Sequence, residues 1–168
     1  MSPTPQRVVV DTNVWLDYYL PNRPGYEIAR RALLAAFTRK ISLLYAVTTA
    51  KDVFFLSSMI LKRDGRRDGH VLTQGDALAI AELSWGFVAN LGEMATAVGA
   101  DNADVWLALK YKHVHRDFED NFVIAAAQRA GADLILTTDE ALMRHAPVAC
   151  MRPEDFLALL ETLEPQTA

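Results

Sequence analysis

Near the start of the chain stands Val8-Val9-Val10-Asp11-Thr12-Asn13, three β-branched residues followed at once by a carboxylate. A run of this kind is typical of a strand that is buried on both faces of a parallel sheet. A second tract of the same form, Leu134-Ile135-Leu136-Thr137-Thr138-Asp139, lies toward the other end. If both strands belong to one parallel sheet, their terminal aspartates converge at its carboxyl edge, where open α/β folds bind ligands.

Strand and helix patterns alternate along the chain. We expect strands at residues 7–10, 41–47 and 134–136, and helices at residues 12–20, 26–37, 48–59, 74–91, 102–111, 118–130 and 140–145. A threonine, Thr48 or Thr49, is expected to cap the third of these helices. Residues 62–70, which carry two glycines and no apolar period, are expected to form an exposed loop. This alternation favours a parallel sheet covered by helices on both faces.

Length and composition favour one domain over residues 1–168, because 168 residues with 51% hydrophobic content can bury a substantial core. The single cysteine, Cys150, excludes an intramolecular disulfide, and no zinc-type Cys/His spacing is present. No apolar run approaches the roughly 18 residues needed to cross a bilayer. We therefore expect a cytoplasmic protein without a membrane span.

The net charge of −4 is unevenly distributed along the sequence. Residues 1–70 hold eleven Lys/Arg and six Asp/Glu, whereas residues 71–168 hold six and fifteen. Two interpretations stay open: a basic face beside an acidic pocket, or an ordinary solvated exterior.

Acidic residues stand at four places where strands end or helices begin. Because residues three apart share a face in the first turn of a helix, Asp117 and Asp120 can reach the same point, while Glu119 between them is expected to point elsewhere. The candidate ligands are Asp11, Asp52, Asp117, Asp120 and Asp139.

Helix capping is the alternative explanation for several of these acids. Asp117 can cap the helix at residues 118–130, with Asp120 completing a capping box, and Asp139 can cap the short helix that follows it. Both interpretations stay open for each residue taken singly.

Gathering the acids in one pocket would require a cation. Two carboxylates ~4 Å apart repel by about 4 kcal/mol at an effective dielectric of 20. Oxygen ligands without cysteine or a histidine pair favour Mg²⁺ or Mn²⁺ over zinc. Since Mg²⁺ readily shares its ligand shell with phosphate oxygens, the pattern indicates phosphodiester cleavage by metal-activated water.

The series Asp11-Thr12-Asn13, Asp52, Asp117-Phe118-Glu119-Asp120 and Thr137-Thr138-Asp139 resembles the PIN domain family, which includes the VapC-like ribonuclease toxins. The resemblance extends over a core of about residues 7–156. It implies a three-layer α/β/α sandwich with a central, mainly parallel sheet. It also implies an acidic cluster that binds Mg²⁺ or Mn²⁺ for RNA hydrolysis.

Carried over by position, the resemblance assigns roles to particular residues. It implies catalytic metal-site acids at Asp11, Asp52, Asp120 and Asp139, an additional acid at Asp117, and supporting polar groups at Thr12, Asn13 and Thr137. The family usually has glutamate where this chain has Asp52, which is one methylene shorter. A small residue is usual where this chain has Asn121.

Basic and aromatic side chains provide further candidates. Phosphate attraction requires positive charge near the substrate, and the basic residues that could contact RNA are Lys62, Arg63, Arg66, Arg67, Lys112 and Arg116. We expect surface roles for His113 and His115. Trp15, Trp85 and Trp106 fit helical apolar faces, which favours packing in a core or interface over base stacking.

The leading interpretation is a Mg²⁺-dependent endoribonuclease, the toxin of a bacterial toxin–antitoxin pair. The resemblance implies a small antitoxin partner and a homodimer. One alternative is a non-catalytic PIN module that binds RNA or protein, because Asp52 departs from the usual pattern. A second, a response-regulator receiver domain, requires an acidic pair, a middle aspartate and a late lysine, which do not occur here in order.

Overall fold

The computed structural model describes residues 4–67 and 69–163 and contains, within them, one five-stranded sheet. The strand order is β3-β2-β1-β4-β5, and every neighbouring pair is parallel. The strands are β1 (Arg7–Val10), β2 (Ser42–Ala46), β3 (Thr96–Val98), β4 (Leu134–Leu136) and β5 (Cys150–Met151). The expected parallel sheet is confirmed, and its two carboxylate-tipped strands, β1 and β4, are neighbours at its centre.

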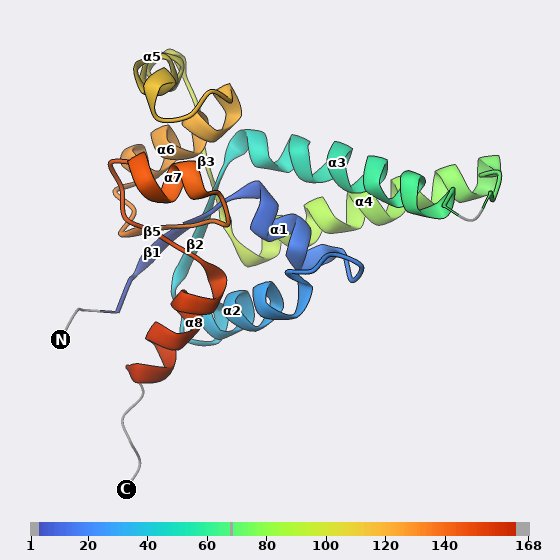
Figure 1. Cartoon of the computed structure of the whole chain (residues 1–168), viewed down its shortest axis with the longest axis horizontal. Helices are drawn as coiled ribbons and strands as arrows, with labels where there is room; N and C mark the ends of the chain where they lie inside the picture. Colours follow the sequence, from blue (N-terminus) through green and yellow to red (C-terminus); the bar gives the residue numbers. More distant parts are fainter. Residues whose placement is uncertain (1–3, 68, 164–168) are drawn as a thin grey trace, which may run out of the picture.

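Helices cover both faces of this sheet (Figure 1). One layer contains α1, α2 and α8, and the other contains α6 and α7 with α5 outside them. The helices are α1 (Thr12–Tyr19), α2 (Tyr26–Thr38), α3 (Val47–Gly65), α4 (Gln74–Met94), α5 (Asn102–Lys110), α6 (Phe118–Ala130), α7 (Glu140–His145) and α8 (Pro153–Thr162), with a 3₁₀ turn η1 (Tyr111–His113) before α6. The expected three-layer α/β/α sandwich is thereby confirmed.

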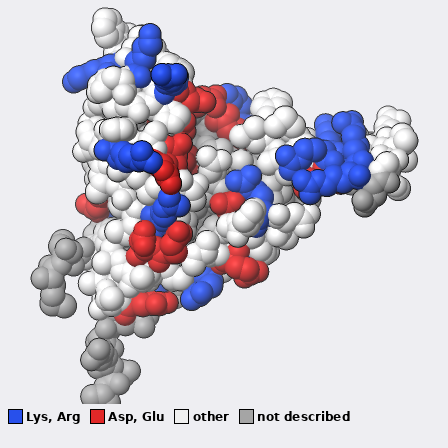
Figure 2. All heavy atoms as spheres, in the orientation of Figure 1, with Lys and Arg blue, Asp and Glu red and all other residues white. Residues whose placement is uncertain are grey.

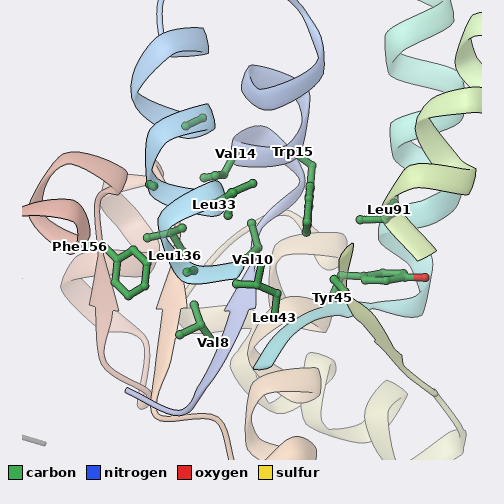
Figure 3. Close-up of a cluster of buried hydrophobic side chains, with 14 of the residues drawn as sticks. Val8, Val10, Val14, Trp15, Leu33, Leu43, Tyr45, Leu91, Leu136 and Phe156 are labelled. Carbon is green, nitrogen blue, oxygen red and sulfur yellow. The ribbon is translucent and has the colours of Figure 1, made fainter. Parts of the chain in front are cut away.

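The period-two alternation of β1 explains how one strand serves both layers. Val8 and Val10 lie in the larger core with Trp15 of α1, as Figure 3 shows. Val9 points to the opposite face, where it packs in a second core with Ile124 of α6. Because all three valines are fully buried, β1 is held in register from both sides and fixes where Asp11 emerges.

The junction between β2 and α3 differs from the sequence-based expectation. The predicted strand at residues 41–47 is shorter, and α3 begins at Val47 with Ala46 as its N-cap. No side chain caps this helix, so neither Thr48 nor Thr49 has the predicted capping role. Asp52 therefore lies in the second turn of α3 and not at its start.

The predicted loop at residues 62–70 is wrong for its first part, because α3 continues to Gly65. Residue 68 lies outside the described residues. Lys62 and Arg63 occupy the last helical turn, where positive charge is favoured by the helix dipole. Apolar periodicity is missing because this end of α3 projects beyond the sheet and has no core to pack against (Figure 1).

Helices α3 and α4 form an antiparallel arm that extends from the sheet (Figure 1). Ser57 and Ser84, both fully buried, hydrogen-bond across the arm at 3.2 Å, and the Phe54 ring lies 4.9 Å from that of Trp85. Several large apolar side chains of the arm are nevertheless exposed: Phe55, Met59, Leu78, Leu83 and Trp85. The arm is thus closed along its inner seam and apolar on part of its outside.

Three elements have no counterpart in the sequence-based expectations. Strands β3 and β5 contain three and two residues, too few to give a recognisable period. Helix α8 had a usable signal, since Pro153 stands in its first turn and is followed by two acids and an apolar stripe. Of the three tryptophans, Trp15 is buried in the core as expected, whereas Trp85 and Trp106 are exposed.

Gly25, just before α2, is required by its neighbour Asp17. A Cβ at this position would overlap the carboxylate of Asp17, which is buried and accepts a hydrogen bond from Arg23. We expect Gly25→Ala to lower the free energy of unfolding by about 1–3 kcal/mol, because the buried acid must shift away from its partner. Urea denaturation measures this.

The matched control for that variant is Gly86→Ala in α4, where a Cβ would meet nothing within 4 Å. Alanine favours a helix over glycine, so this control should be at least as stable as the wild type. A Gly25→Ala protein as stable as the wild type would show that Asp17 moves at no cost.

No helix in the described part of the chain is both long and apolar enough to cross a membrane.

Candidate metal centre

The candidate centre lies where β1 and β4 end side by side. Asp11 follows β1, is 1% exposed, and donates its backbone N–H to the carbonyl oxygen of Leu136 at 3.0 Å. The hydroxyl of Thr137 donates to Asp11 Oδ2 at 2.8 Å, and the hydroxyl oxygen of Thr137 accepts the backbone N–H of Asp139 at 3.0 Å. Thr137, which is fully buried, thus ties together the two acids that follow the two strands.

Asp139 has two roles at once. Its Oδ1 accepts the backbone N–H groups of Ala141 and Leu142, at 2.7 and 2.9 Å, so it caps α7 as the alternative interpretation expected. Its Oδ2 lies 3.3 Å from the Nε2 atom of His115. The cap therefore fixes the orientation of the carboxylate without removing it from the centre.

The start of α6 supplies two more acids. Asp117 is the N-cap and accepts the N–H of Glu119 at 2.8 Å, but the predicted capping box with Asp120 is not formed. The backbone N–H of Asp117 donates to His115 Nδ1 instead. Asp120 in the first turn is left to interact with the other acids, and the proximity of Asp11 helps to raise its pKa.

His115 lies in the centre, so the predicted surface role is wrong for it. Its Nδ1 accepts the Asp117 N–H at 3.0 Å, which leaves the ring proton on Nε2, facing Asp139. Asp120 Oδ2 also lies 3.0 Å from Nδ1, a contact between two acceptors that is favourable when Asp120 holds a proton. His113 is exposed and remains at the surface as expected.

Asn121 holds the backbone of this histidine through a hydrogen bond. The Asn121 side chain is buried and its Nδ2 donates to the backbone carbonyl of His115 at 2.9 Å. A small residue could not make this bond, which explains why an amide stands at this position.

An acidic pocket of about 170 Å³ opens beside the centre. Its lining includes the hydroxyl-bearing Thr12, Thr48 and Thr49, the amide of Asn13, and five carboxylates: Asp11, Asp52, Asp117, Glu119 and Asp120. The prediction that Glu119 points elsewhere is wrong, because its side chain also lines this pocket. The pocket is small enough to be lined by the N-cap and by successive residues of the first turn of α6. Sequence position alone could not exclude Glu119.

Lys51 lies at the edge of this pocket. Its Nζ atom is 2.7 Å from Glu119 Oε1 and 3.2 Å from Asp52 Oδ1. Asp52 is mostly buried, and burial raises the pKa of its carboxyl, while Lys51 opposes that rise. The sequence pattern predicts no functional role for Lys51 or Glu119. For Lys51 a usable signal exists, because a lysine stands directly beside an expected ligand, Asp52.

Burial and the repulsion between neighbouring carboxylates make it costly for the acids of the pocket to ionise. Burial, opposed mainly by the Thr137 hydrogen bond, raises the pKa of Asp11 to about 6. Burial, and then the charge of Asp11, raises the pKa of Asp120 to about 7. Carboxyls that resist ionisation near neutral pH are stabilised as anions by a cation. This donor set therefore fits a divalent metal ion.

Three side chains of the centre also lie close enough together to surround a cation. His115, Asp120 and Asp139 each offer one atom, and these atoms lie within 4.8 Å of one another. Because the Asp117 N–H occupies His115 Nδ1 and the Nε2 proton faces Asp139, this histidine is better placed to orient the carboxylate than to bind an ion through nitrogen.

Of the other predicted residues, Thr12 lies beside the acids, whereas the basic residues do not line the acidic pocket. The Thr12 hydroxyl donates to Thr49 at 3.3 Å, while its backbone N–H bonds to the Asp11 carboxylate. Lys112 and Arg116 line a separate hollow beside α7. The basic cluster, defined as Lys62, Arg63, Arg66 and Arg67, lies at the tip of the α3–α4 arm, where Figure 2 shows crowded Lys and Arg side chains.

Comparisons with known proteins agree with the resemblance found in the motifs. The family model described as PIN domain matches residues 7–141. A crystal structure of FitAcB from Neisseria gonorrhoeae is similar, with a TM-score of 0.59 and 16% sequence identity over 88% of this chain and 98% of that chain. At that identity the likeness concerns the fold alone. No curated protein gives a significant match.

Proposed function

The chain belongs to the PIN domain family, and from this premise we propose that it is a metal-dependent endoribonuclease and the toxin of a bacterial toxin–antitoxin pair. One observation carries the proposal. Asp11 follows β1, Asp120 lies in the first turn of α6, and Asp139 caps α7 just after β4. Thr137 links Asp11 to Asp139, and the His115 ring contacts both Asp120 and Asp139, so the three acids meet at one sheet edge. Three buried or half-buried carboxylates in one place have a stability cost unless a cation compensates them.

The proposed ion is Mg²⁺ or Mn²⁺, held by Asp11, Asp120 and Asp139 with Asp52 and Asp117 at the other side of the pocket. When bound, such an ion polarises a phosphate oxygen and lowers the pKa of a water molecule, which lets water act as nucleophile at neutral pH. No residue of the chain then needs to form a covalent intermediate.

The surrounding residues position the acids. Thr137 bonds to both Asp11 and the backbone of Asp139, so the two carboxylates cannot drift apart. His115 donates to Asp139 and is itself held by Asn121. Asn13 lines the pocket and is exposed, which suits a contact with substrate. Groups of this kind fix ligand orientation and support metal affinity.

For RNA contact we propose the basic cluster on the arm together with Lys112 and Arg116. Arg63 and Arg67 lie 3.2 and 3.7 Å from Asp64, while Arg66 and Arg67 are exposed at the tip. The cluster is ten residues or more beyond Asp52 along α3, so it would hold a phosphate backbone at a distance from the cleavage point. Such contacts attract and position RNA without reading its sequence.

A small antitoxin and a second copy of the chain are the proposed protein partners. The exposed apolar side chains of the arm support the presence of a partner, since a helix apolar on most sides is normally covered. A single domain with a core over residues 7–156 and a cytoplasmic location remain predictions.

The function is tested with purified protein and single-stranded or structured RNA. Cleavage is expected with Mg²⁺ or Mn²⁺ and none with EDTA, because the acids alone cannot activate water. Cleavage that persists in EDTA would contradict the proposal. RNA binding without cleavage in the presence of any of the metals tested would favour the non-catalytic module. The observation that supports this alternative is that Asp52 stands where the family usually has glutamate.

The toxin assignment has its own test. Induced expression is expected to arrest growth, and co-expression of a small protein from an adjacent reading frame should restore it. Growth unaffected by an RNA-cleaving protein would indicate a housekeeping nuclease instead.

A further inference from the structure

Lys51 bridges two acids that come from different elements. Its ammonium group contacts Asp52 on its own helix, α3, and Glu119 on α6, at 3.2 and 2.7 Å. The two elements are held together here by a lysine whose side chain is still 54% exposed. The bridge therefore gives two acids of the pocket a positive partner without burying the lysine.

Four of the five carboxylates of the pocket thereby fall into two groups, while the fifth, Asp117, caps α6. Asp52 and Glu119 share the positive charge of Lys51. Asp11 and Asp120 have no lysine or arginine contact in the described residues, and their nearest basic group is His115, 3.0 Å from Asp120. Only the second group is short of a cation.

A second divalent ion would have to use the first group. In two-metal phosphodiesterases the ions lie about 3.5–4 Å apart and share carboxylates from both sides of the site. Asp52 is one methylene shorter than glutamate, and its Oδ1 atom already faces the ammonium group. A metal on that side would have to displace Lys51 from both of its partners.

We propose that Lys51 takes the place of a second metal ion, so that the chain binds one divalent ion, on the side of Asp11, Asp120 and Asp139. This inference rests on the proposed metal-dependent function and adds the number of ions and the residue that sets it. Lys51 is in this sense a positioning residue: it holds Asp52 and Glu119 and excludes a cation.

The test counts bound Mn²⁺ by isothermal titration calorimetry and by electron paramagnetic resonance, on the full chain without RNA. Wild type is expected to bind one Mn²⁺ and to give the spectrum of an isolated ion. Lys51→Met, which keeps an unbranched side chain only one atom shorter and removes its charge, is expected to bind two and to show the spectrum of a coupled pair. Lys51→Arg is expected to bind one.

Lys110→Met is the matched control, since it removes one positive charge from the exposed end of α5, away from the pocket. It is expected to bind one Mn²⁺. If net charge alone governed the count, this variant would bind two as well, and the proposal would be overturned.

Two further results would overturn it. One is a coupled Mn²⁺ pair in the wild type, which needs no variant to fold. The other is a single Mn²⁺ in a Lys51→Met protein with a native circular dichroism spectrum. A wild type that binds no Mn²⁺ would instead remove the metal-dependent function, and this inference with it.

Discussion

Replacing Asp120 by Asn is expected to abolish RNA cleavage, and Asp11→Asn is expected to have the same effect. Each change removes a charged oxygen from the proposed metal ligands while keeping the shape of the side chain. Loss of a residue that merely orients a metal ligand costs about 10–100-fold, so loss of a ligand charge should reduce the rate by roughly 100-fold or more. Single-turnover cleavage of a labelled RNA with Mn²⁺ measures the effect.

The control for this prediction is Asp155→Asn in the first turn of α8, an exposed acid outside the pocket. It changes the net charge by the same amount and should cleave at the wild-type rate. Full activity in both Asp11→Asn and Asp120→Asn would reject the metal mechanism, provided that circular dichroism shows a native fold in each.

The same substitution at Asp120 is expected to stabilise the metal-free protein. Its pKa is raised to about 7 in the folded chain from an ordinary 3.8, chiefly by burial and then by the charge of Asp11. Below about pH 4 the carboxyl is protonated in both states and costs nothing. As pH rises toward 7 the unfolded chain ionises first, so the folded state becomes relatively less stable.

In EDTA at pH 8, Asp120→Asn should therefore unfold at a higher temperature than the wild type. Allowing for solvent screening at a half-buried group, the gain is about 2 kcal/mol, or roughly 4–8 °C for a chain of this size. The difference should shrink as pH falls toward 4. Saturating Mn²⁺ should reverse the order, because binding to the folded state stabilises only a protein that keeps its ligands.

Thermal melts of both proteins at several pH values, with EDTA and with Mn²⁺, give all three comparisons. A variant less stable than the wild type in EDTA at pH 8 would mean that the acids are not crowded. An identical Mn²⁺ effect on both proteins would mean that Asp120 does not bind the ion.

Much of this site follows from local pattern. A β-branched run that ends in an acid occurs twice, and parallel strands place their carboxyl ends at one edge, so Asp11 and Asp139 could be predicted to approach each other. Helix α6 was also predictable, because its N-cap Asp117 and its left-handed Gly131 mark both ends within the local sequence.

Other features depended on contacts between elements. The end of α3 and the two-residue strand β5 have no apolar period of their own, so their boundaries could not be read from the pattern. His115 looked like a surface residue because nothing in the neighbouring sequence reveals that its ring faces an acid 24 positions away. Local periodicity carries no information about such partners.

By itself, the sequence determined that helices cover both faces of a parallel sheet, and it identified four of the five acids that line the pocket, because hydrophobic period and strand-end position are properties of neighbouring residues. Only the tertiary structure decided that Glu119 joins these acids in the pocket and that Lys51 contacts both Asp52 and Glu119. Lys51 and Glu119 are 68 residues apart. Their contact exists because α3 and α6 dock at the same sheet edge, and docking depends on packing over the whole chain.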